Sequence, residues 1–141
     1  DLQPEMSATK VTEHVVEELT THQPDFLCLN FANPDMVGHT GVYKAIIQAV
    51  ETVDSCLEKI VSTGLENGYT FIVIADHGNA DQMIKPDGSP HTAHTTALVP
   101  AIFVGLDSCS PEPGKLADVA PTLLKMMGME TPEEMTGKSL Y

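Results

Sequence analysis

Residues 69–79 read Tyr-Thr-Phe-Ile-Val-Ile-Ala-Asp-His-Gly-Asn, a run of β-branched and aromatic residues that ends in a polar turn. The apolar part, 69–75, has no polar alternation, which is typical of a strand buried on both faces of a parallel sheet. Residues 26–31, Phe-Leu-Cys-Leu-Asn-Phe, predict a second buried strand, and 101–104 a shorter third one. Ligands of parallel sheets bind beyond the carboxyl ends of the strands, so chemistry is expected directly after residues 31 and 75.

Helices are predicted around these strands. Residues 9–21 carry Val11, Val15 and Leu19 at four-residue spacing, and a long helix is expected from about 42 to 63. The stripe of that long helix consists of Ile46, Ala49, Val53, Leu57 and Ile60. A last helix should begin at Asp118 as N-cap and end at Gly128. This order predicts an α/β fold, a mainly parallel sheet flanked by helices, in one folded unit.

The composition excludes several classes of function. The chain has 20 acidic and 7 basic residues, all 7 of them Lys, and a net charge of -13, so it lacks the basic face of a nucleic-acid-binding protein. Three dispersed cysteines favour a reducing cytoplasm, and no apolar run approaches the roughly 18 to 20 residues that span a bilayer. The first residue is Asp1 instead of Met, so we expect a piece of a longer protein.

Metal-competent side chains follow the first two predicted strands. If Asn33 caps a short helix and Pro34 is its first residue, Asp35 and His39 lie four apart on one face. After the next strand come Asp76 and His77, and the glycine that follows allows both side chains to turn inward. Two more imidazoles, His91 and His94, lie in the long polar loop that follows.

Each piece alone has a structural explanation. A carboxylate such as Asp35 can complement a helix N-terminus, Asp76-His77-Gly78 can be an ordinary turn, and loop histidines are commonly exposed to water. Four of six histidines in three polar loops, two of them at the same expected sheet edge, favour a metal site instead. Mixed Asp/His ligation suits Mn²⁺, Zn²⁺ or Fe better than Mg²⁺. Two such ions about 3.5 to 4 Å apart would clamp a phosphoryl group.

Three stretches, 33–41 (Asn-Pro-Asp-Met-Val-Gly-His-Thr-Gly), 75–80 (Ala-Asp-His-Gly-Asn-Ala) and 91–96 (His-Thr-Ala-His-Thr-Thr), closely resemble the metal motifs of one family. This family is the cofactor-independent (2,3-bisphosphoglycerate-independent) phosphoglycerate mutases of the alkaline phosphatase superfamily. The ends of the chain, 1–7, 118–124 and 135–140, also resemble it. The resemblance implies that residues 1–141 are the C-terminal portion of a metal-binding, alkaline-phosphatase-like domain, which is incomplete.

The resemblance also implies two Mn²⁺ ions. Asp35, His39 and His94 would bind the first ion, and Asp76 and His77 the second. His91 is left out, because two imidazoles three apart in a loop need not both face inward. The implied reaction is the glycolytic interconversion of 3-phosphoglycerate and 2-phosphoglycerate through a phosphoserine intermediate, an isomerase activity.

The chain departs from the family in extent. An N-terminal segment with the serine nucleophile and another Asp ligand, and an Arg-rich transferase domain that holds phosphoglycerate, have no counterpart in it. No serine of the chain lies at a strand-to-helix turn that would activate it, so we expect no catalytic nucleophile and an inactive isolated chain. The alternatives are another phosphotransferase or hydrolase of the superfamily, or a metal-binding module without catalysis.

Overall fold

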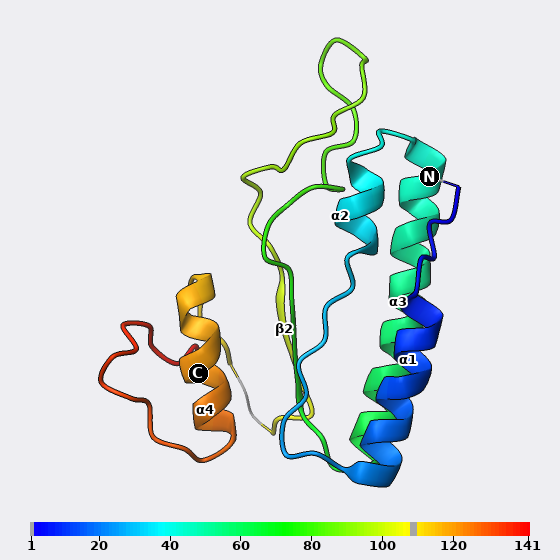
Figure 1. Cartoon of the computed structure of the whole chain (residues 1–141). Coiled ribbons are helices and arrows are strands. Elements are labelled where there is room, and N and C mark those ends of the chain that lie inside the picture. Colours follow the sequence, from blue (N-terminus) through cyan, green and yellow to red (C-terminus); the bar gives the residue numbers. More distant parts are fainter. Residues whose placement is uncertain (1, 108–109) are drawn as a thin grey trace. The chain divides into compact units, whose positions relative to one another are not determined.

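The structure, a computed structural model, describes residues 2–107 and 110–141. Its elements in chain order are α1 (Ala8–Glu17), the π-helical turn η1 (Glu18–His22), α2 (Asn33–Gly38), α3 (Tyr43–Glu66), β1 (Phe71–Ile74), β2 (Ala101–Val104), the 3₁₀ turn η2 (Leu116–Asp118) and α4 (Val119–Met126) (Figure 1). Contacts divide the chain into two compact units, Asp1–Gly105 and Leu106–Tyr141, where the sequence predicted one. Of the three cysteines, Cys109 lies outside the described residues.

The first unit is built on the packing of α1 against α3. Val15, Leu19 and Ile60 form its buried cluster, with exposures of 7%, 2% and 4%. The predicted apolar stripes of both helices are therefore confirmed. The first helix continues through η1 as far as His22, and Gln23 then adopts a left-handed conformation just before the helix-stopping proline.

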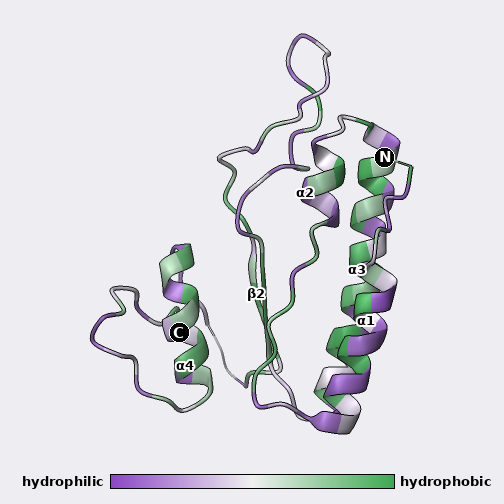
Figure 2. Ribbon diagram, in the orientation of Figure 1, coloured by the Kyte–Doolittle hydropathy of each residue, from purple (hydrophilic) through white to green (hydrophobic). Residues whose placement is uncertain are grey.

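Residues 26–31 run extended beside this cluster but have no strand partner among the described residues. Leu27, Leu29 and Phe31 pack against the cluster, while Phe26 is 51% exposed. The prediction of a strand buried on both faces is thus wrong for this structure, because a central strand needs a neighbour on each side. Figure 2 shows that this segment and the strands, which carry hydrophobic residues, run alongside α1 and α3.

β1 and β2 pair antiparallel, with Phe71 opposite Val104 and Ile74 opposite Ala101. The mixed α/β class is confirmed, but the parallel pairing expected of these two strands is wrong. A parallel pair needs a crossover, usually a helix. Residues 75–100, all of them described, contain no helix. The loop that leaves the carboxyl end of β1 therefore returns to the same end of the sheet to begin β2.

A second apolar cluster holds α2 against α3. Val37, Ala45, Ile46 and Ala49 are buried there, and partly buried Ala80 and Met83 of the long loop pack against them. This packing fastens the loop after β1 to α2 and to the amino-terminal half of α3, which come much earlier in the chain. Val37 of this cluster lies between Asp35 and His39 in sequence, so the cluster anchors the helix that carries two of the predicted ligands.

The second unit, residues 106–141, is organised around Asp118 and Thr122. The Asp118 carboxylate accepts hydrogen bonds from the backbone N–H groups of Lys115 at 2.9 Å and Lys138 at 3.0 Å. Asp118 is the residue before α4, as predicted, but its side chain makes these bonds instead of capping the helix. Gly128, with φ of 69°, follows the end of the helix as expected.

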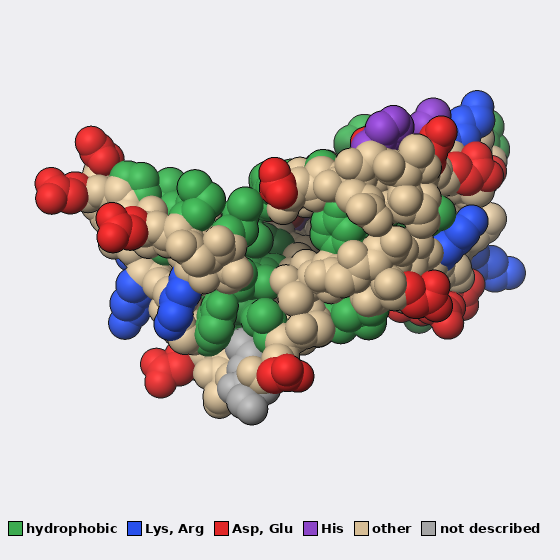
Figure 3. Space-filling model, turned by 90° about the horizontal axis from the view of Figure 1, so that it is seen from below, with side chains coloured by type: hydrophobic (Ala, Val, Ile, Leu, Met, Phe, Trp, Pro, Cys, Tyr) green, Lys and Arg blue, Asp and Glu red, His purple; other side chains and the backbone are tan. Residues whose placement is uncertain are grey.

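The hydropathy of the helices and the distribution of surface charge are the remaining features of the fold. Among the described residues, no helix combines the length and apolar character needed to cross a membrane. Figure 3 shows exposed acidic side chains at several places, with Lys side chains close to some of them.

Candidate metal centre

Helix α2 places Asp35 and His39 on one face. The four-residue spacing brings the Nε2 atom of His39 to 3.1 Å from Oδ1 of Asp35, as the sequence predicted. The expected cap is wrong, however, because Ala32 precedes the helix and makes no side-chain cap bond. The buried Asn33 side chain instead donates to the carbonyl oxygens of Pro4 and Glu5, both at 2.9 Å, and ties α2 to the N-terminal segment.

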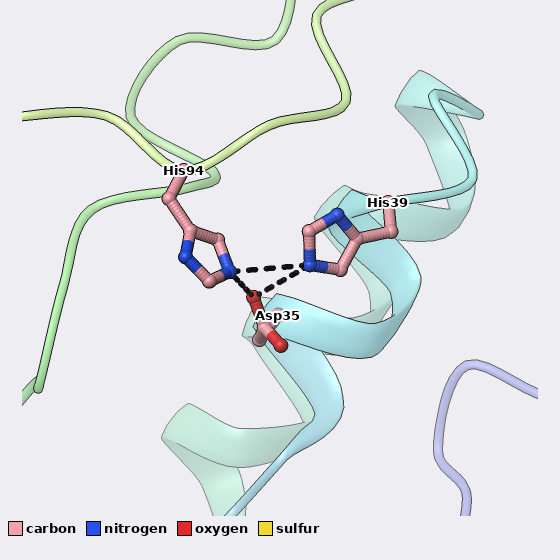
Figure 4. A group of neighbouring side chains, drawn as sticks. All are labelled: Asp35, His39 and His94. Atoms are coloured by element: carbon pink, nitrogen blue, oxygen red, sulfur yellow. Dashed lines mark hydrogen bonds and ion pairs between the residues drawn. The ribbon is translucent and has the colours of Figure 1, made fainter.

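His94 reaches the same carboxylate from the long loop. Its Nε2 atom lies 3.0 Å from Oδ1 of Asp35 and 3.2 Å from Nε2 of His39 (Figure 4). An isolated antiparallel bridge between Gly78 and Thr95 fastens the loop beside the turn after β1. One ligand atom from each of Asp35, His39 and His94 lies within 4.8 Å of the others, a spacing at which they could share one cation.

The turn after β1 brings the second predicted pair to this place. The His77 ring stacks on His94 with centroids 3.6 Å apart, and its Nε2 lies 3.9 Å from Oδ1 of Asp35 and 3.6 Å from Oδ1 of Asp76. The Asp76 side chain is 80% exposed and lies at the rim. All five predicted ligands therefore gather at one end of the sheet, with Asp35 at the centre.

Backbone contacts indicate which ring nitrogens carry protons. The Nδ1 atom of His39 lies 2.7 Å from the carbonyl oxygen of Thr92, and Nδ1 of His77 lies 3.3 Å from that of Gly78. A carbonyl oxygen only accepts, so Nδ1–H is the donor in both rings. In His39 the ring nitrogen nearest Asp35 is then Nε2, the atom through which the ring would bind a metal.

Asp35 is held as an anion. Burial acts to raise its pKa, but the hydrogen bond from Asn79 and the charges of His39 and His94 together outweigh burial and leave the pKa below its usual value. A carboxylate that stays ionised is the form that binds cations. Asn79 was not among the predicted site residues, and its place in the same turn as Asp76 and His77 was the signal available in the sequence.

The remaining histidines stand apart from this group. The backbone N–H of His91 donates to the carbonyl of Met83, and its ring Nδ1 is buried without a hydrogen-bond partner. Within the described ranges, the group that could hold a metal contains His94 and not His91. His14 and His22 lie exposed on α1 and η1, near Glu17 and Glu18 respectively.

The donor set fits a divalent transition metal. One carboxylate oxygen and two imidazole nitrogens suit Mn²⁺, Fe²⁺, Co²⁺ or Zn²⁺, and fit Ca²⁺ or Mg²⁺ poorly. Three protein ligands also leave coordination positions open, which is the arrangement of catalytic metal sites. The side-chain exposures of 34%, 42% and 48% for Asp35, His39 and His94 show that the group is accessible to a ligand.

Comparisons with known proteins show the family of the chain. A sequence model of the metalloenzyme superfamily matches residues 1–131. The chain is 54% identical over 140 residues to a 2,3-bisphosphoglycerate-independent phosphoglycerate mutase of Flavobacterium johnsoniae, and 52% identical over 145 residues to that of Clostridium novyi. The alignments cover 99% and 100% of this chain, and the chain spans 28% of the length of each relative.

A solved structure gives the same result. The phosphoglycerate mutase of Leishmania mexicana, crystallised at low cobalt concentration, superposes with a TM-score of 0.85 at 34% sequence identity. The match covers 98% of this chain and 29% of that one. With a family match along nearly the whole chain and clustered Asp and His side chains at one sheet end, the chain belongs to the metalloenzyme superfamily.

Proposed function

We propose that residues 1–141 are the C-terminal, metal-binding portion of the phosphatase-like domain of a 2,3-bisphosphoglycerate-independent phosphoglycerate mutase. Asp35, His39 and His94 bind one Mn²⁺ ion, and Asp76 and His77 contribute to a second. The observation that supports this best is the convergence of three separate sequence motifs on Oδ1 of Asp35, within 3.0 to 3.1 Å of two histidine nitrogens. Two relatives that bear this enzyme name are 54% and 52% identical to the chain over the aligned residues.

The activity belongs to a longer protein, because the chain spans only 28% of the length of its relatives. We propose that this protein interconverts 3-phosphoglycerate and 2-phosphoglycerate in cytoplasmic glycolysis through a phosphoserine intermediate. The serine, another Asp ligand and an Arg-rich domain that holds the substrate come from outside residues 1–141. The absence of Arg from the chain supports this division, since phosphate and carboxylate are best held by the guanidinium fork.

The residues of this chain prepare the site for that reaction. Asp35 is held as an anion, and the Nε2 atoms of His39 and His94 both approach its Oδ1. Backbone carbonyl oxygens accept hydrogen bonds from the Nδ1–H groups of His39 and His77, which fixes the orientation of both rings. When bound, the two metal ions neutralise phosphate charge and lower the pKa of the serine hydroxyl.

Calorimetric titration with Mn²⁺ tests the ligand assignment in the complete gene product that carries this sequence. Asp35→Ala and His94→Ala should each weaken Mn²⁺ binding. His14→Ala, a substitution of an exposed histidine on α1, should leave binding as in the wild type. Unchanged binding in both Asp35→Ala and His94→Ala would remove the first-metal assignment.

Substrate assays test the reaction class. The complete protein should convert 3-phosphoglycerate to 2-phosphoglycerate, whereas hydrolysis of p-nitrophenyl phosphate without mutase activity would indicate a hydrolase of the same superfamily. The isolated segment 1–141 should show no mutase turnover, because it lacks the nucleophile. Robust turnover in a preparation free of host enzyme would contradict the proposed division of labour.

A further inference from the structure

Asn79 is the buried residue that contacts the centre of the site. It is 7% exposed, and its Nδ2 atom lies 2.7 Å from Oδ1 of Asp35 and 3.4 Å from the backbone carbonyl oxygen of the same residue. Oδ1 is the same atom that His39 and His94 approach at 3.1 and 3.0 Å. The amide group of Asn79 thus bridges the main chain and the side chain of Asp35.

The chemistry of the partners settles the orientation of this amide. An ionised carboxylate and a backbone carbonyl oxygen accept hydrogen bonds and cannot donate them. The atom of Asn79 that faces Asp35 must therefore be the NH₂ group, whose two hydrogens serve the two acceptors. With both bonds made, the carboxylate of Asp35 is restrained in its rotation relative to α2, although its side chain is 34% exposed.

Gly38 provides the space that this arrangement needs. A Cβ atom at Gly38 would lie 2.2 Å from Oδ1 and 2.8 Å from Cγ of Asn79, closer than packed atoms approach. Gly38 has no positive φ, so backbone strain does not explain a glycine here. Glycine is a poorer helix former than alanine, so the close approach of the Asn79 amide is the feature that calls for a glycine at the end of α2.

We propose that Asn79 is a positioning residue for the divalent metal ion bound by Asp35, His39 and His94. Its amide holds Oδ1 of Asp35 toward the two ring nitrogens, so little side-chain freedom is lost when the ion binds. Gly38 is required because its missing side chain admits that amide. This inference rests on the proposed function of the site and assigns a role to a residue that does not touch the ion.

The test removes the hydrogen-bond donor of Asn79 and keeps the shape of its side chain. Asn79→Leu retains the branching of the side chain but cannot donate a hydrogen bond, and Asn67→Leu is the matched control. Asn67 donates to the carbonyl of Thr63 at the end of α3. In the complete protein, Mn²⁺ titration should show a dissociation constant about 10- to 100-fold higher for Asn79→Leu, the range found when partners of metal ligands are removed. Asn67→Leu should bind as the wild type does.

A second variant keeps the inference testable if Asn79→Leu does not fold. Gly38→Ala leaves every ligand and Asn79 in the sequence, favours the helix, and forces the amide away from Asp35. It should weaken Mn²⁺ binding and shift the visible absorption of the Co²⁺-loaded protein. In an Asn79→Ala background Gly38→Ala should have no further effect, because the clash has been removed.

The outcomes separate this inference from the proposed function. Loss of Mn²⁺ binding in Asp35→Ala together with wild-type binding in Asn79→Leu would overturn the role of Asn79 alone. Additive effects of Gly38→Ala and Asn79→Ala would also overturn it, since independent sites add. Wild-type binding in Asp35→Ala would instead refute the metal site itself.

Discussion

Replacing Ile46 by alanine should destabilise the part of the fold that supports the metal centre. Ile46 is 1% exposed in the cluster that joins α2 to α3. The substitution removes three buried carbons, at about 0.8 kcal/mol each a transfer loss of about 2.4 kcal/mol. Ile46 also borders a hollow lined by Ile47, Val50 and Met83, whose side chains can move into part of the void. The expected loss is therefore about 2 to 3 kcal/mol, in the lower half of the usual range.

Urea unfolding of the metal-free protein, followed by far-UV circular dichroism, measures this loss. Ile47→Ala is the matched control, since Ile47 is the next residue of the same helix and is 38% exposed. It should cost less than Ile46→Ala, because the exposed part of Ile47 stays in water on folding and contributes no transfer free energy. Equal losses for the two variants would show that α2 does not depend on this face of α3, and would refute the packing argument.

Three further predictions concern other parts of the structure. Hydrogen bonds from the backbone N–H groups of Lys138 and Lys115 hold the pKa of Asp118 below its usual value, so its stabilisation is present above that value and is lost as pH falls through the lowered pKa. The hydrogen-exchange protection factors of these two amides should fall over that acid range, and unchanged protection factors would contradict the assignment. Gly64→Ala should lower the unfolding temperature, because the new Cβ would lie 2.2 Å from the Phe71 ring and overpacking of about 1 to 3 kcal/mol exceeds the helix-propensity gain of about 1 kcal/mol. Mn²⁺ at about 100 times its dissociation constant should stabilise the complete protein by about 2.7 kcal/mol, and an unfolding midpoint unchanged by chelation would contradict metal binding to the folded state.

The sequence alone determined the features that depend on neighbours along the chain. The stripes of α1 and α3 follow from helical periodicity, and the four-residue spacing of Asp35 and His39 is enough to put both on one face of α2. The three motifs also carried the family resemblance, because they are short and contiguous. Each of these features needs one segment and a local geometry, so the order of residues along the chain is enough to predict it.

Only the tertiary structure decided how the segments meet. The antiparallel pairing of β1 and β2 returns the long loop to the end of the sheet where it began, and this brings His94 to Asp35 from 59 residues away. The fit of Asn79 between Asp35 and Gly38 likewise depends on α2 packing beside the turn after β1. Such contacts join segments whose separation in sequence carries no periodic signal. They depend on apolar packing between those segments, such as that of Ala80 and Met83 against the buried Val37 of α2 and Ile46 of α3.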